Sequence, residues 1–202
     1  MPRRAREQSI LDAAGQVFAR GYHGASMDEI AGLADVSKPM LYAYFGSKEG
    51  LYVAYVDRTG RELLDRLAGA TTPDNQPSVR LRAGILEFLA FIEEHRDGWQ
   101  VLFGELTSMG PVVEEVAVLR RRIAEWIMAV LAGASGGRER AADMSVQATA
   151  HAIVGAGESL ANWWLENPDV RRDQVADWYM GMILAAASTA TGEGRSAATR
   201  DA

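Results

Sequence analysis

Residues 26–52 read S-M-D-E-I-A-G-L-A-D-V-S-K-P-M-L-Y-A-Y-F-G-S-K-E-G-L-Y, and this stretch decides the fold. It predicts two short helices joined by a tight turn and followed at once by a third helix. Ser26 and Glu29 have the spacing of a capping box, in which two side chains satisfy free amides of the first turn. Ser37 can cap the second short helix, where Pro39 fits because a first-turn residue needs no N–H donor. This order of elements is a helix-turn-helix.

Helical spacing continues on both sides of this stretch. Before it, apolar residues recur at the spacing of one helix face up to Gly21, which we expect to end that helix. That face consists of Ile10, Ala13, Ala14, Val17 and Phe18. After it, Ser47 opens a fourth helix, expected over 47–69, and a turn-rich break follows. We therefore expect a helix-turn-helix domain over residues 1–50, with the fourth helix as a connector.

The rest of the chain is expected to be helical as well. Apolar faces with helical spacing recur in five segments, at 81–92, 99–106, 116–130, 140–166 and 171–190. The last two are apolar on more than one side, so a second surface must cover them, most simply another subunit. The sequence thus predicts an all-α protein with a second domain over residues 77–191. The small, polar residues 192–202 are expected to form a disordered tail.

Composition narrows the class of protein. The 202 residues have a net charge of −6 and no cysteine, so disulfides, zinc–thiolate sites and thiol catalysis are excluded. No long uncharged apolar run opens the chain, and we expect a cytoplasmic protein that does not enter a membrane. The first 48 residues hold six basic and five acidic side chains, so the acidity lies in the remainder. If the helix-turn-helix binds DNA, it does so through a few specific contacts rather than through a diffuse positive field.

The chain resembles the TetR family of transcriptional regulators. The resemblance rests on the capped S-x-x-E-I-A helix, on the run V-S-K-P-M-L-Y-A-Y-F-G-S-K-E-G-L-Y and on the long helix after it, and it is close over residues 8–55. It implies a homodimer with one helix-turn-helix in each subunit. It further implies dimerisation through the last two helices and a C-terminal domain that binds a small effector.

The helix-turn-helix supplies the candidate DNA contacts. Lys38 opens the second short helix, where its side chain can reach base edges or phosphate in a major groove. Lys48 opens the next helix, where its charge and the free amides can meet the DNA backbone. The full set is Ser26, Ser37, Lys38, Pro39, Tyr42, Tyr44 and Lys48. The alternative is that the serines are only caps and the tyrosines only core.

Direct readout of bases is expected to be sparse. Met40 and Ala43 stand where the family often has polar or aromatic DNA contacts, and Pro39 replaces a commoner small residue. Lys38 and apolar contact to thymine methyls are then the main candidates, with DNA shape and half-site spacing sharing the specificity. The first arginines of the chain either contact DNA or form a solvated, disordered tail; they are Arg3, Arg4 and Arg6.

The second domain is rich in aromatic side chains, and pockets lined by such residues hold small apolar ligands. The candidate pocket consists of Phe88, Trp99, Phe103, Trp126, Glu158, Asn162 and Trp163. His151, Glu158 and Asn162 lie near one helix face, so they either bind a ligand's polar head or satisfy each other across a dimer. We favour the dimer, because glycines 155 and 157 suit close helix approach. The candidate dimer contacts are His151, Val154, Gly155, Trp178 and Met182.

An enzyme is not expected. The three histidines, at positions 23, 95 and 151, lack metal-ligand spacing, and the sequence has neither a nucleophile elbow nor a phosphate-cradling glycine loop. We expect no cofactor and no metal. The expected partners are double-stranded operator DNA, a second copy of the chain and a small hydrophobic effector. The sequence therefore predicts a transcriptional repressor released from a palindromic operator by that effector; the alternative is a helical protein-interaction module without effector response.

Overall fold

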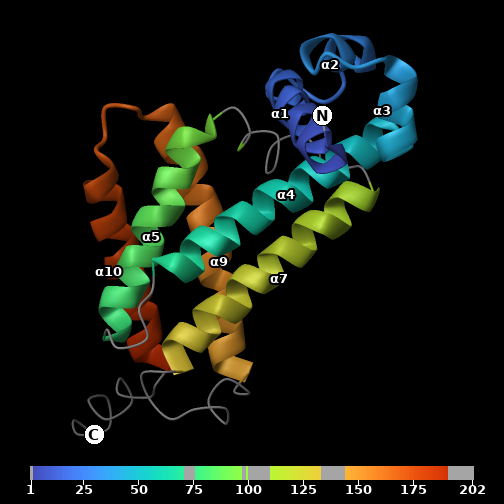
Figure 1. The fold of residues 1–202 in the computed structure, drawn as a ribbon. Helices are drawn as coiled ribbons and strands as arrows, with labels where there is room; N and C mark the ends of the chain where they lie inside the picture. Colours follow the sequence, from blue (N-terminus) through green and yellow to red (C-terminus); the bar gives the residue numbers. More distant parts are fainter. Residues whose placement is uncertain (1, 71–75, 97–98, 100–109, 133–143, 191–202) are drawn as a thin grey trace, which may run out of the picture. The chain divides into compact units, whose positions relative to one another are not determined.

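A computed structural model describes residues 2–70, 76–96, 99, 110–132 and 144–190. Within these ranges the regular secondary structure is helical, which confirms the all-α fold (Figure 1). The helices are α1 (Arg3–Phe18), α2 (Met27–Leu33), α3 (Lys38–Phe45), α4 (Lys48–Gly69), α5 (Pro77–Glu94), α7 (Gly110–Ala132), α9 (Met144–Glu166) and α10 (Arg172–Ala190). Among the described residues, no helix has the length and apolar character needed to cross a membrane.

The chain divides into two compact units. The first unit consists of Met1–Glu62 and Glu94–Leu119, and the second unit consists of Leu63–Glu93 and Arg120–Ala202. Helices α4 and α7 each begin in the first unit and end in the second, so the boundary falls inside two continuous helices. Three sequence predictions lie outside the described residues: Phe103, most of the segment 99–106, and the tail 192–202.

The first unit is built on the apolar face of α1. All five residues predicted for that face are buried, from Ile10 to Phe18. Figure 1 shows α1, α2 and α3 gathered at the start of α4. The rings of Phe18 on α1 and Tyr52 on α4 meet edge to face with centroids 4.9 Å apart, a geometry that aromatic pairs prefer. Leu41 is fully buried and anchors α3 in this core, which leaves the opposite face of α3 outward.

The helix ends largely follow the sequence signals. Gly21 after α1 and Gly46 after α3 have φ of 109° and 74°, a backbone region that glycine enters without steric cost. Ser47 Oγ accepts a hydrogen bond from the amide of Gly50 at 3.0 Å, so it caps α4 as predicted. The turn between α2 and α3 contains Asp35 with a φ of 52°, a left-handed conformation that is uncommon outside glycine.

Two local predictions need correction. The capping box at α2 forms only in part: Ser26 Oγ accepts from the amide of Asp28 at 3.2 Å, while the carboxylate of Glu29 is paired with Arg20. Glu29 is drawn away because a cationic partner outside the helix competes with the neutral backbone amide. The N-terminal arginines are not a disordered tail either, since α1 begins at Arg3.

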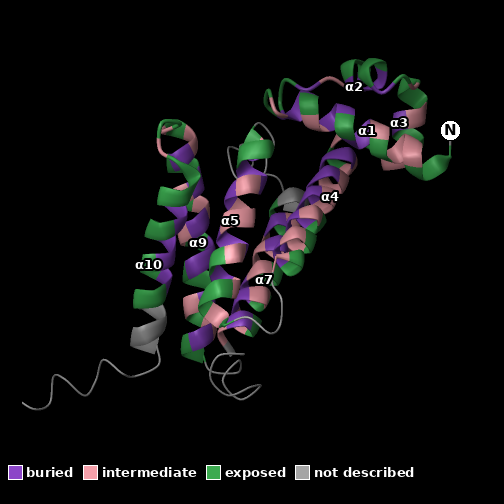
Figure 2. Cartoon of the chain, turned by 60° about the vertical axis from the view of Figure 1, so that its left-hand side comes forward, coloured by how far each residue is buried: buried purple, intermediate pink, exposed green. Residues whose placement is uncertain are grey.

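The second unit contains α5, α9 and α10 with parts of α4 and α7. Helices α9 and α10 pack against each other. At their contact the hydroxyl of Tyr179 donates to the carbonyl oxygen of Ile153 at 2.6 Å, and Gly157 leaves room for the same ring. Figure 2 shows α10 with buried residues along the side toward α9 and exposed residues along the rest. The contact between α9 and α10 therefore buries one side of α10 and leaves its other sides exposed.

Candidate functional site

Helix α3 presents the candidate recognition surface. Ser37, Lys38 and Pro39 are exposed at its start, and Tyr42 is 44% exposed one turn later. Its buried Leu41 fixes the helix against the core. A short helix with an outward polar start and an inward apolar anchor can lie in a DNA groove without losing its own packing.

Lys38 does not extend freely into solvent. Its Nζ lies 2.8 Å from Oδ2 of Asp28, in the first turn of α2. The hydrogen bond to this carboxylate raises the pKa of Lys38, so the ammonium stays charged. Asp28 was not among the predicted contacts; the available signal was an acidic residue in the first turn of α2, the helix before α3.

Lys48 is held differently. Its Nζ lies 3.3 Å from the carbonyl oxygen of His23 and 4.5 Å from the centroid of the Tyr22 ring. Burial of this half-buried side chain lowers the pKa of Lys48. The ammonium is thus directed at the loop between α1 and α2, where both contacts favour the cation.

The serines and the tyrosines differ among themselves. The Ser26 hydroxyl already caps α2, whereas the exposed Ser37 makes no side-chain capping hydrogen bond although it is the N-cap residue of α3. Tyr44 is half-buried against the first unit's core, with the guanidinium of Arg3 5.4 Å from its ring centroid. Ser26 therefore serves as a helix cap, and Tyr44 packs against the core. Ser37 and Tyr42 are exposed and have neither role.

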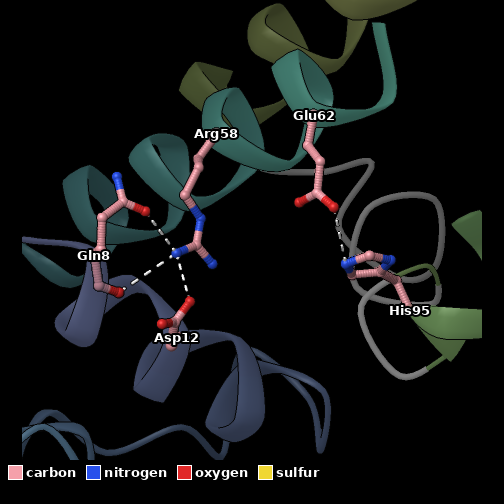
Figure 3. Close-up of polar contacts among 5 residues, drawn as sticks. All are labelled: Gln8, Asp12, Arg58, Glu62 and His95. Atoms are coloured by element: carbon pink, nitrogen blue, oxygen red, sulfur yellow. Dashed lines mark hydrogen bonds and ion pairs between the residues drawn. The ribbon is translucent and has the colours of Figure 1, made fainter. Parts of the chain in front are cut away.

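In the same unit Arg58 joins α4 to α1 (Figure 3). Its Nη1 donates to Oδ1 of Asp12 at 2.6 Å, and to the side-chain and backbone oxygens of Gln8 at 3.2 and 3.4 Å. One turn further along α4, Oε1 of Glu62 lies 3.8 Å from Nε2 of His95. No local sequence pattern reveals these pairs, because their partners are more than 30 residues apart.

Two of the predicted pocket residues share one small core. Phe88 and Trp126 both pack against a small core of the second unit formed by Leu63, Leu67 and Phe91. Trp99 is buried but belongs to the first unit, and Asn162 and Trp163 are exposed on α9.

Glu158 is partly buried in the second unit and paired with a residue that the sequence reasoning missed. Its two carboxylate oxygens each lie 2.7 Å from a nitrogen of Arg120 on α7. The carboxylate was expected to bind a ligand's polar head or a polar partner across a dimer. The structure instead shows an ion pair within the chain. Such a bidentate pair fixes both side chains in orientation.

The predicted dimer contacts lie on α9 and α10, and all but one are exposed. His151 and Gly155 are exposed on α9, and Trp178 and Met182 are each 52% exposed on α10. Val154 is buried inside the unit instead. Trp163, predicted for the pocket, lies beside Trp178 with ring centroids 6.3 Å apart.

Two protein-family models match the chain. Residues 10–55 match a model described as bacterial regulatory proteins of the tetR family, and residues 77–186 match one described as a tetracyclin repressor-like C-terminal domain. The first match contains α2, α3 and the start of α4, and the second contains α5, α7 and α9.

Individual proteins are similar along most of the chain. FasR from Mycolicibacterium smegmatis, an HTH-type transcriptional activator, is 36% identical over 171 residues, which cover 83% of this chain and 75% of FasR. The crystal structure of a TetR-like transcriptional regulator from Rhodococcus sp. RHA1 is 35% identical with a TM-score of 0.73, covering 95% of this chain and 99% of that one. FadR from Bacillus subtilis, solved in complex with stearoyl-CoA, is 17% identical with a TM-score of 0.76, covering 89% and 98%, and shares the fold.

Proposed function

Because the chain belongs to the TetR family of transcriptional regulators, we propose that it is a homodimeric repressor that a small, mainly hydrophobic effector releases from its operator. The chain is a DNA-binding transcriptional regulator. The observation that carries the proposal is the outward face of α3, with Ser37, Lys38, Pro39 and Tyr42 exposed above the anchor Leu41. These four residues would meet the major groove, with Lys48, Ser26 and Tyr44 as further predicted contacts.

A dimer would double this surface. Two recognition helices in one two-fold assembly would meet successive major grooves of a palindromic operator. The exposed rings of Trp163 and Trp178, with the exposed Met182 one turn after Trp178 on α10, support pairing through α9 and α10. Neighbouring large apolar side chains on the surface of a protein mark interaction sites.

The effector would bind in the second unit, near Phe88 and Trp126. Both are aromatic and partly buried, and Glu158 with Arg120 supplies polar groups that can orient a ligand. FadR from Bacillus subtilis has the same fold, and its crystal structure is a complex with stearoyl-CoA. To release DNA, the effector must bind the DNA-incompetent conformation more tightly, and couplings of about 1–3 kcal/mol are typical.

Activation of transcription is the second candidate. It is favoured by one observation, the description of the 36%-identical FasR as an activator. The two candidates share the same DNA contacts and differ in where the operator lies relative to the promoter. A promoter fusion transcribed in vitro with and without the protein separates them, since a repressor lowers and an activator raises the transcript.

The first experiment is DNA binding. Fluorescence polarisation would compare the DNA upstream of the chain's own gene with a scrambled duplex at two salt concentrations. We expect tighter binding to the upstream duplex and a steep fall in affinity with salt, because phosphate contacts release counterions. Equal, weak binding to both duplexes would count against an operator at this position and favour a helical interaction module.

A further inference from the structure

The first turn of α2 carries two carboxylates that engage cations of neighbouring elements. Asp28 binds Lys38 at the start of α3, with 2.8 Å between Oδ2 and Nζ, and Glu29 binds Arg20 just after α1. Both pairs lie at the surface of the first unit. The Lys38 and Asp28 side chains are 44% and 71% exposed, so a third charged group can reach them from solvent.

Of these two cations, Lys38 belongs to the proposed recognition surface. The inference therefore rests on the proposed DNA-binding function of α3. In the free protein its ammonium already has an anionic oxygen at hydrogen-bonding distance. A DNA phosphate would offer the same chemistry, an anionic oxygen that accepts from an ammonium. The carboxylate and the phosphate therefore compete for one group.

We propose that Asp28 competes with DNA phosphates for the ammonium of Lys38 and thereby limits the affinity of the protein for DNA of any sequence. Phosphate contacts position a protein on DNA and carry no sequence information. A regulator must avoid the many non-specific sites of a genome, so an internal competitor for a phosphate-binding cation is useful. The contact also keeps the Lys38 side chain beside α2 in the absence of DNA.

The competition has a signature in salt dependence. When a phosphate replaces Asp28, the freed carboxylate is left without its ammonium, so part of the electrostatic gain is lost. Without the carboxylate, Lys38 should contribute a full phosphate contact, which steepens the slope of log K against log salt by at most about 0.9 for each subunit. Since exposed pairs are weak, the gain in affinity should be about two- to fivefold for each subunit.

The test is a double-mutant cycle on Asp28 and Lys38, read by fluorescence polarisation on the upstream and the scrambled duplex. Asp28→Asn should tighten binding to both duplexes by a similar factor. In a Lys38→Gln background the same change should give no more than the gain of Glu29→Gln, because the ammonium under competition is gone. Glu29→Gln is the charge-matched control, and any gain that it gives should be the same with and without Lys38. Thermal unfolding of each variant verifies the fold.

Three results would overturn the proposal. They are a gain from Asp28→Asn no larger than that of Glu29→Gln, a gain that is undiminished in the Lys38→Gln background, and a gain confined to the upstream duplex. Persistence would mean that Asp28 repels DNA directly, and confinement to one duplex would mean that Lys38 reads a base. A wild type that binds both duplexes equally would instead contradict the operator proposal, and the cycle on the scrambled duplex would still decide the role of Asp28.

Discussion

At the scale of single residues, Asp35 links backbone conformation to stability. It holds a φ of 52° in the turn between α2 and α3, where a Cβ is crowded and a short polar side chain is tolerated better than an aliphatic one. Asp35→Ala should lower the free energy of unfolding by about 0.5–1 kcal/mol, and Asp35→Gly should lower it less. Urea denaturation measures both. Equal losses would show that contacts of the carboxylate, and not the backbone, set the cost.

At the scale of elements, Arg58 should hold α1 to α4. Arg58→Gln removes a cation with three acceptors on α1, and we expect the free energy of unfolding to fall by about 1–2 kcal/mol. Arg61→Gln, one turn along the same helix, is the matched control. Arg61 is exposed and pairs with Asp57 on its own helix, so its loss should cost about 0.5 kcal/mol or less. If chemical denaturation gave the same loss in free energy of unfolding for both variants, Arg58 would not be a link between the two helices.

The approach of α5 to α7 depends on a glycine. A Cβ added at Gly84 would overlap the ring of Trp126, and Gly84→Ala should therefore destabilise the chain by about 1–3 kcal/mol. Gly32→Ala on α2 is the control, because no atom lies within 4 Å of its added Cβ and alanine favours a helix. The smaller ring in a Gly84→Ala, Trp126→Phe double variant should recover part of the loss. A Gly84→Ala protein as stable as the wild type would mean that the helices separate at little cost.

At the scale of the whole molecule, the proposed dimer should depend on α10. Trp178→Glu places a charge in the proposed interface and should yield a monomer in light scattering coupled to size-exclusion chromatography. DNA affinity should fall with it, because a monomer engages one half-site. Val79→Glu, at an exposed apolar residue of α5, should leave the dimer intact. A Trp178→Glu protein that stays dimeric would locate the interface elsewhere.

Much of the fold is predictable from local patterns. The apolar face of α1, the start of α4 after Ser47 and the glycines after α1 and α3 all follow from residues within a few positions of one another. Helical periodicity and capping are local physics, and so they can be read from one stretch of chain. The capped helix-turn-helix also carries the resemblance that led to the family. In this sense the helices, their order and the DNA-binding class are determined by the sequence alone.

The tertiary structure decided which partner each charged or aromatic side chain has. Lys48 is turned to the ring of Tyr22, and Arg58 reaches Asp12, 46 residues away. Trp163 is exposed beside Trp178. Because α9 is apolar on more than one side, periodicity alone does not show which of its faces is buried. Such partners depend on how each helix is rotated and where its neighbours lie, and no local pattern encodes that. The pairing of Lys38 with Asp28 belongs to the same class, because it exists only once α2 and α3 have packed at their mutual angle.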